Sequence, residues 1–247
     1  MNNLDGINCV LFDLDDTLVA FDAVTEPSWR QVCADYRKRT GLISEERLYQ
    51  AIAKHGNLYW SNEEMHRIGR LDIESARRRI VGEAFRELNL PQEDSAVVAD
   101  HFSKLRIEKM YLMPEAVETL SRLHENGKEL GLLTNGDSLT QRGKIKRFGL
   151  GNYFKCILVE GELGYGKPDE RIFRKALEVM DSRPDETMMV GDSLQWDVAG
   201  PQAVGIRGIW YNGKGVSLSQ DAKTKPFRMI RRLSELFDIL GISINKS

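Results

Sequence analysis

The chain alternates short, almost wholly apolar runs with longer segments in which apolar residues recur at helical spacing. The apolar runs are too short for helices and predict buried strands at 7–12, 130–133, 156–159, 187–190 and 206–210. The segments on either side of the later four runs predict helices at about 115–126, 138–148, 170–180, 195–204 and 229–240. Near-continuous apolar strands that alternate with helices are typical of a parallel sheet covered on both faces, so the pattern predicts a doubly wound α/β fold.

The stretch from about residue 22 to residue 110 contains no apolar run of this kind and is rich in Arg, Glu, Ala and Leu. Its helical periodicity predicts helices at 28–39, 44–54, 72–88 and 92–109. We therefore expect residues 1–18 and 112–247 to form one discontinuous core domain. Residues 19–111 are expected to form an inserted, all-helical cap domain over the carboxyl edge of the sheet. The basic cluster Arg77–Arg79 could contact an anionic substrate, but the nearby Glu74 and Glu83 favour a solvated helix face of paired charges.

Composition excludes several classes of protein. The 247 residues suffice for a core domain with an insert, and the formal net charge of −2 gives no bulk attraction to nucleic acid polymers or anionic membranes. No apolar run approaches the roughly 18 residues of a membrane-spanning helix, and no leader pattern stands at the start. Cys9 and Cys156 lie in apolar runs and are expected to be buried thiols, so we expect a reducing, cytoplasmic compartment.

Two carboxylates, Asp13 and Asp15, follow the first predicted strand directly. The carboxyl edge of an open α/β sheet is where ligands bind, and acids crowded there require a cation. Asp13 could then attack phosphorus as a nucleophile, while Asp15 could protonate a leaving alcohol and later activate water. An ordinary capped turn would use the same residue types, so the pair alone leaves both interpretations open.

The ends of the later strands carry further polar residues. Thr134 and Asn135 follow the second strand, where a hydroxyl and backbone amides can bind phosphate oxygens, although a strand-to-helix turn has the same composition. Lys167 stands before a helix-opening proline and could offset charge on a nucleophile and a phosphoryl group, or be a solvated lysine. Asp192 follows the fourth strand and could share a Mg²⁺ ion with Asp13 or cap a helix, and Asp197 could support it.

Taken together, these residues all stand on the same side of one predicted sheet. An acid pair, a hydroxyl, a lysine and a further acid would therefore converge on one crevice. They supply a nucleophile, a proton donor, phosphate-binding groups and metal ligands, which is the set of groups that phosphoryl transfer requires.

At this point the sequence resembles the haloacid dehalogenase superfamily over essentially its whole length. Phe12–Leu18 is similar to the first family motif, Leu132–Gly136 to the second, and Gly164–Pro168 to the third. Val190–Ser193, with Asp197, is similar to the fourth. The resemblance implies a Rossmann-like core with a helical cap inserted after the first motif.

The resemblance also implies roles for individual residues. Mg²⁺ would be held by the Asp13 carboxylate, the Asp15 main-chain carbonyl and Asp192. Asp13 would be the nucleophile and Asp15 the general acid and base, and the phosphoryl group would be bound by Thr134, Lys167 and the backbone of Asn135. The dehalogenases of the family lack a carboxylate at the position of Asp15, because halide release needs no proton, so its presence favours phosphate esters.

The expected protein is thus a Mg²⁺-dependent phosphomonoesterase that acts on a small soluble phosphorylated molecule, a sugar phosphate or a nucleotide. A phosphomutase of the same fold and a non-hydrolytic, phospho-accepting signalling domain remain as alternatives. We expect no nucleic acid polymer and no membrane as partners, and a monomer or a homodimer.

Overall fold

The computed structural model describes residues 6–218 and 223–243. Contacts between residues divide the chain into two compact units. The first, here the core unit, comprises the described residues up to Ala20 and from Leu112 onward, and the second, here the helical unit, is Phe21–Tyr111. Each unit is described by itself.

The core unit is built on one six-stranded parallel sheet with the strand order β3-β2-β1-β4-β5-β6. The strands are β1 (Cys9–Phe12), β2 (Glu129–Thr134), β3 (Cys156–Val159), β4 (Thr187–Gly191), β5 (Arg207–Tyr211) and β6 (Arg228–Ile230). This is the order of a Rossmann-type sheet, in which the strand order reverses beside β1. The predicted α/β class with a doubly wound parallel sheet is confirmed.

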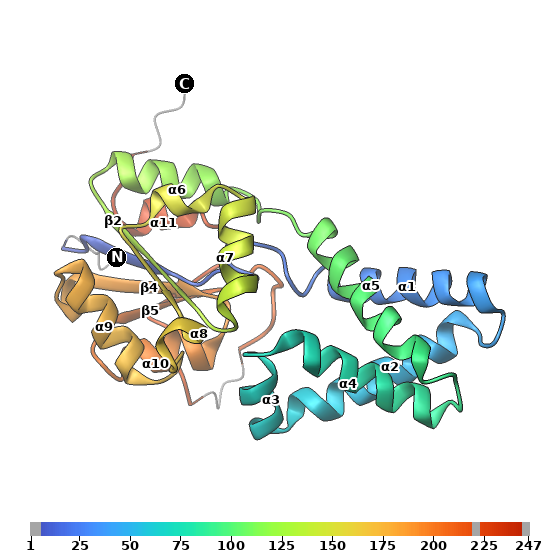
Figure 1. Ribbon diagram of the computed structural model, residues 1–247. Coiled ribbons are helices and arrows are strands. Elements are labelled where there is room, and N and C mark those ends of the chain that lie inside the picture. Colours follow the sequence, from blue (N-terminus) through green and yellow to red (C-terminus); the bar gives the residue numbers. More distant parts are fainter. Residues whose placement is uncertain (1–5, 219–222, 244–247) are drawn as a thin grey trace. The chain divides into compact units, whose positions relative to one another are not determined.

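Helices cover both faces of this sheet. In Figure 1, α6 and α11 lie on one side of the strands, and α9 and α10 lie on the other. The helices of the core unit are α6 (Ala116–Glu125), α7 (Ser138–Arg147), α8 (Glu160–Leu163), α9 (Glu170–Met180), α10 (Gly200–Gln202) and α11 (Glu235–Ile239), with 3₁₀ turns η1 (Leu150–Tyr153) and η2 (Pro184–Glu186) and a π-helical segment, η3 (Leu194–Ala199). Asp137 and Asp169 cap α7 and α9 by accepting from the backbone N–H groups of Thr140 and Arg171.

The end of the chain differs from the prediction of a helix over 229–240. The chain first forms the edge strand β6, in which Arg228 pairs with Ile209 of β5, and a helix begins only at Glu235. Met229, the first residue of the predicted helix, lies on this edge strand and is 45% exposed. The prediction was wrong because a strand of three residues is too short to show an apolar period, while pairing supplies partners for the backbone of β5.

The helical unit contains α1 (Thr25–Thr40), α2 (Glu45–Ser61), α3 (Glu63–Gly69), α4 (Ile73–Glu87) and α5 (Glu93–Lys109). The side chains of Ser44, Asn62 and Asp72 each accept from a backbone N–H in the first turn of the helix that follows, which explains where α2, α3 and α4 begin. The sequence predicts a second helix that ends at residue 54 and no helix over 63–69, whereas α2 continues to Ser61 and α3 follows it. The break between α2 and α3 is set by the Asn62 cap, which is visible only as a single residue in the sequence.

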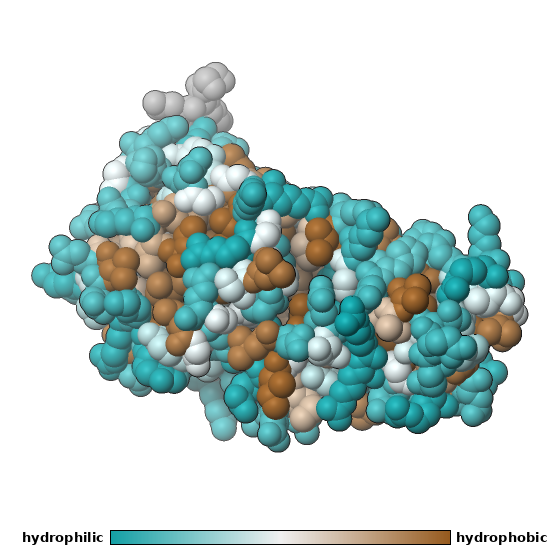
Figure 2. Space-filling view, viewed as in Figure 1, coloured by the Kyte–Doolittle hydropathy of each residue, from teal (hydrophilic) through white to brown (hydrophobic). Residues whose placement is uncertain are grey.

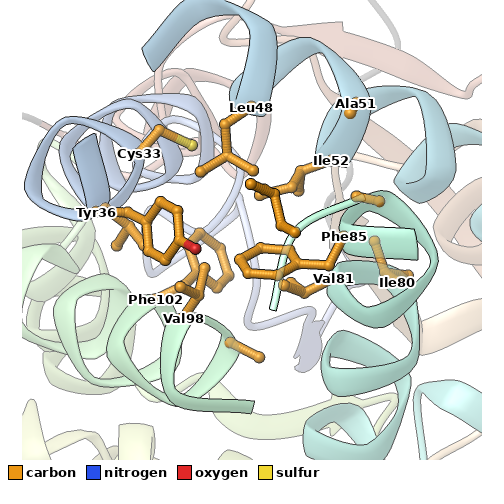
Figure 3. Close-up of a cluster of buried hydrophobic side chains, with 14 residues drawn as sticks. Cys33, Tyr36, Leu48, Ala51, Ile52, Ile80, Val81, Phe85, Val98 and Phe102 are labelled. Atoms are coloured by element: carbon orange, nitrogen blue, oxygen red, sulfur yellow. The ribbon is translucent and has the colours of Figure 1, made fainter. Parts of the chain in front are cut away.

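Figure 3 shows the apolar centre of the helical unit, where Tyr36, Phe85 and Phe102 meet aliphatic side chains from α2, α4 and α5. The prediction that Arg77–Arg79 form a solvated face was wrong for Arg77, whereas Arg78 and Arg79 are exposed. The Arg77 side chain is buried, donates to Ser103 at 3.0 Å and has its guanidinium 5.3 Å from the centre of the Phe102 ring. The paraffinic stem of arginine packs with apolar groups, so the basic cluster in the sequence concealed a core position.

The polar surface and the buried cysteines agree with what the composition predicts. Hydrophilic side chains cover most of the face seen in Figure 2. No helix within 6–218 or 223–243 is both long and apolar enough to cross a bilayer. Cys9 and Cys156 are buried, as expected, and so is Cys33.

Candidate active site

The turn after β1 places the side chain of Asp13 at the carboxyl edge of the sheet. The backbone N–H of Asp13 donates to the carbonyl of Val190 at 2.9 Å, which joins this turn to the end of β4. Thr17, one turn further on, donates its hydroxyl to Asp13 Oδ2 at 3.1 Å. The Asp13 residue is only 7% exposed, and this burial raises the pKa of its carboxyl group to about 7, against the opposing charge of Lys167.

Lys167 is the cation of this site. Its side chain is 1% exposed, and its ammonium donates to Asp13 Oδ1 at 2.6 Å and to Asp197 Oδ1 at 2.7 Å. Burial alone would lower the pKa of Lys167, but the two carboxylates outweigh it and raise that pKa above its ordinary value. Asp197 also accepts from the backbone N–H of Ser193 at 3.0 Å, so it holds Lys167 against the loop after β4.

The loops after β2 and β3 are tied together by side chains. Asn135 donates from Nδ2 to the carbonyl of Lys167 at 2.7 Å and accepts from the Lys167 backbone N–H at 2.8 Å. The buried carboxylate of Glu160 accepts from the backbone N–H of Gly136 at 3.0 Å. The sequence predicts that the backbone of Asn135 contacts phosphate; in the structure the Asn135 side chain fixes the position of the loop that carries Lys167.

Asp192 completes a group of three acids. One carboxylate oxygen from each of Asp13, Asp192 and Asp197 lies within 4.8 Å of the others. Burial raises the pKa of Asp192 to about 8, and the charges of Asp13 and Asp197 add to this rise. The Trp210 indole donates to the Asp192 carbonyl at 2.9 Å and fixes the backbone there. Clustered carboxylate oxygens, from the buried Asp13 and Asp197 and the half-buried Asp192, suit a hard divalent cation such as Mg²⁺, and one ammonium does not balance three carboxylates.

The Asp15 side chain contacts a different part of the core unit. Both of its oxygens accept from the ammonium of Lys144 at 2.7 Å, and Oδ2 also accepts from Gln141 Nε2 at 3.0 Å. Gln141 Nε2 donates in addition to the hydroxyl of Thr134. Helix α7 therefore connects the predicted acid/base residue to the predicted phosphate-binding hydroxyl.

Comparison with protein-family models agrees with the acids and the lysine found at the carboxyl edge of the sheet. A family model described as haloacid dehalogenase-like hydrolase matches residues 7–205, which is most of the chain. The chain belongs to this family.

Curated members of the haloacid dehalogenase-like family align along much of this chain. A glyceraldehyde 3-phosphate phosphatase of Pyrococcus furiosus is 29% identical over 95% of this chain and 93% of its own. The pyrimidine 5'-nucleotidase YjjG of Escherichia coli is 30% identical over 82% of this chain and 85% of its own. Among solved structures, the magnesium-bound putative HAD-hydrolase YfnB of Bacillus subtilis has a TM-score of 0.71 at 25% identity, over 96% of this chain and 99% of its own.

Two polar residues of this haloacid dehalogenase-like site were not found by sequence reasoning. Gln141 and Lys144 stand three apart on α7, so they share one face of the helix, and both are buried. Residues such as Arg142, Lys146 and Arg147 surround them in the sequence. The only available signal was their spacing, which an exposed polar helix face would show as well.

Gly191 is expected to be essential for the position of Asp197. A Cβ atom at Gly191 would lie 2.3 Å from Cγ of Asp197, closer than any real contact. We predict that Gly191→Ala lowers the free energy of unfolding by about 1–3 kcal/mol, as overpacking does, because Asp197 must leave Lys167 or strain the strand. Urea unfolding of the purified variant measures this.

Gly143→Ala is the matched control for that experiment. Apart from its chain neighbours and the backbone of its own helix, no described atom lies within 4 Å of the Cβ position at Gly143, which is a helical residue of α7. Alanine there is expected to raise the free energy of unfolding by about 0.5–1 kcal/mol, because glycine loses more backbone entropy in a helix. Equal effects at the two glycines would contradict the close packing of Asp197 on the end of β4.

Proposed function

We propose that this protein is a Mg²⁺-dependent phosphomonoesterase that hydrolyses a small phosphate ester through an aspartyl-phosphate. It belongs to a hydrolase family, and its relatives are named as phosphatases or as a nucleotidase, which makes it a phosphatase of that family. The observation that carries the proposal is the buried Asp13 carboxylate between Lys167 and Thr17, beside the oxygens of Asp192 and Asp197.

In the first step, an oxygen of Asp13 forms a bond to phosphorus as the bond from phosphorus to the ester oxygen breaks. Asp15 gives its proton to the departing alcohol. Lys167 and the hydroxyl of Thr134 offset negative charge on the transferring oxygens, together with the backbone of Asn135. The products of this step are the free alcohol and the Asp13 phosphoester.

In the second step, water attacks the phosphorus atom and the bond from phosphorus to the Asp13 oxygen breaks. Asp15, now ionised, accepts the proton that the water loses. Inorganic phosphate leaves, and Asp13 and Asp15 return to their starting forms. Asp15 gives one proton in the first step and takes one back in the second, so the cycle needs no other acid or base.

The residues that would hold Mg²⁺ are Asp13 and Asp192 through their carboxylates and Asp15 through its main-chain carbonyl. Their hard oxygen donors fit this ion. The Asp197 carboxylate lies close to those of Asp13 and Asp192 and is paired with Lys167. When bound, the cation lets anionic phosphate approach an anionic nucleophile by neutralising their charges. Burial and mutual repulsion of the carboxylates favour binding of such a cation.

The proposed substrate class is a small soluble phosphate monoester, either a sugar phosphate or a nucleotide. Relatives named for glyceraldehyde 3-phosphate, phosphoserine and pyrimidine 5'-nucleotides support this range. We further propose that the helical unit, Phe21–Tyr111, is the cap that selects the alcohol part of the ester. The cytoplasm and a monomeric or homodimeric state stay predictions from the sequence.

Metal removal tests the proposal. After treatment with a chelator, the protein is expected to release no phosphate from p-nitrophenyl phosphate, and added Mg²⁺ is expected to restore the activity. Mg²⁺ should also raise the melting temperature, because it relieves repulsion among the clustered carboxylates. In Asp192→Asn both responses should be lost, whereas Asp185→Asn, which changes a carboxylate with 66% of its side-chain surface exposed, should keep them.

The same assay separates the alternatives. Prompt release of inorganic phosphate into water supports a phosphatase. A phosphoprotein that persists for minutes after a pulse of phosphodonor would favour the signalling domain, and transfer to a sugar hydroxyl without phosphate release would favour the mutase. Full activity in chelator would contradict the magnesium part of the proposal.

A further inference from the structure

Helix α7 carries two buried polar side chains that have no role in the two proposed reaction steps. Gln141 and Lys144 are one turn apart, and the Lys144 side chain is only 5% exposed. A lysine is rarely buried to this degree without a fixed partner. Its partner is Asp15, which lies 129 positions away in the sequence and whose side chain is 25% exposed.

The contacts of Asp15 with α7 occupy both of its oxygens. Lys144 Nζ lies 2.7 Å from each oxygen, and Gln141 Nε2 lies 3.0 Å from Oδ2. The backbone of Asp15 belongs to a tight turn, in which Asp16 N–H donates to Val19 at 2.7 Å and Asp16 has a φ of 58°. With its backbone fixed by the turn, the Asp15 side chain is oriented by α7.

Gln141 adds a second link. Its amide nitrogen also donates to the hydroxyl oxygen of Thr134. That hydroxyl therefore acts as an acceptor toward α7 and has its own hydrogen left to donate. At present it donates to the Asn135 carbonyl over 3.4 Å, a long bond that a phosphate oxygen would replace with little loss.

We propose that Lys144 and Gln141 are positioning residues: both orient the Asp15 carboxyl group toward the leaving alcohol, and Gln141 also directs the Thr134 hydroxyl toward phosphate. This inference rests on the proposed phosphatase function. A general acid works only within hydrogen-bond reach of the oxygen that it protonates, and displacement of a reacting group by about 1 Å costs about 100-fold in rate. Bonds from Lys144 to both oxygens restrict the ionised Asp15 carboxylate of the second step to one orientation. When Asp15 carries the proton that it gives in the first step, one oxygen keeps the contact with Lys144 and the other holds that proton.

Two esters that differ by one nitro group test this role. Phenyl phosphate has a poor leaving group that needs a proton, whereas p-nitrophenyl phosphate has a good one that needs none. The single-turnover rate of phenol release measures transfer to Asp13 alone. We expect Lys144→Met to lower this rate by about 10- to 100-fold for phenyl phosphate, within the 100- to 10,000-fold range of general acid catalysis. For p-nitrophenyl phosphate we expect a decrease of less than about 3-fold, because no proton transfer is required.

Lys146→Met is the matched control, because Lys146 is an exposed lysine on the same helix. It should leave both rates unchanged. In an Asp15→Asn background, Lys144→Met should cause no further loss for phenyl phosphate, because a residue that acts through Asp15 has nothing left to position. Gln141→Leu should raise the inhibition constant of inorganic phosphate about 5-fold, which corresponds to one poorly directed hydrogen bond.

Each outcome bears on a separate claim. An equal loss on both esters in Lys144→Met would mean a general structural role and would overturn the inference, as would an unchanged or faster rate on phenyl phosphate. An additive loss in the Asp15→Asn background would overturn it too. If Lys144→Met does not fold, an unchanged inhibition constant and an unchanged ratio of the two ester rates in Gln141→Leu would overturn it. A wild-type protein that releases phenol from neither ester would instead refute the proposed function, and this inference with it.

Discussion

Asp13→Asn is expected to abolish phosphate release while the fold remains intact. The amide is a poor nucleophile toward phosphorus, so the first step of the proposed mechanism has no attacking group. Loss of an enzyme's nucleophile typically lowers turnover by about 10⁵-fold or more. Steady-state phosphate release from p-nitrophenyl phosphate measures the loss.

The expected stability of Asp13→Asn follows from its neighbours. Lys167 keeps its bond to Asp197 at 2.7 Å, and the asparagine oxygen can still accept from Lys167. The substitution also removes one of three crowded carboxylates. We therefore expect the free energy of unfolding to change by no more than about 1–2 kcal/mol, which urea unfolding measures.

A second readout isolates the covalent step. After an acid quench during turnover, intact-mass measurement should find a phosphoryl group on the wild-type protein and none on Asp13→Asn. Asp185→Asn, at an exposed carboxylate of the core unit, should behave as wild type. Near-wild-type turnover in Asp13→Asn would remove the assignment of Asp13 as the nucleophile.

The strands and the loops beside them were predictable because their signals are local. The predicted run at 187–190 became β4 (Thr187–Gly191), and that at 156–159 became β3. Once these strands lie parallel, the residues just beyond their ends must share one edge of the sheet. This is why Asp13 and Asp192, which directly follow β1 and β4, could be expected near one another from the sequence alone. Lys167 lies beyond α8 rather than at a strand end, and its place followed from the helix that opens after it.

The contacts of Gln141 and Lys144 on α7 were not predictable, because they are not local in the sequence. Whether Gln141 and Lys144 face solvent or the site depends on Asp15, a residue from the far end of the chain, and not on their neighbours in the helix. In a helix as polar as α7, burial of two polar residues leaves no mark on the apolar pattern. The misplaced Arg77 and the missed strand β6 have a similar origin, because tertiary contacts decided both.

Lys167→Met is expected to destabilise the core unit and to abolish activity together. The side chain of Lys167 is 1% exposed and joins Asp13 and Asp197. Removing the shared cation of a buried ion pair leaves uncompensated charge, which costs about 3–5 kcal/mol in the free energy of unfolding. Methionine keeps most of the volume of the chain, so the loss reports charge more than packing. Urea unfolding and phosphate release measure the two effects.

A compensating substitution tells these two effects apart. In Lys167→Met/Asp197→Asn, one of the two stranded carboxylates is neutral, so much of the lost stability should return, whereas phosphate release should stay absent because no cation remains beside the transferring group. Lys175→Met, at a partly exposed lysine of α9 paired with Glu178, should change the free energy of unfolding by no more than about 0.5 kcal/mol. If Lys167→Met were as stable as this control, the pairing of Lys167 with both acids would contribute nothing to the fold. If the double variant recovered activity along with stability, Lys167 would serve only to balance charge and would have no direct part in phosphoryl transfer.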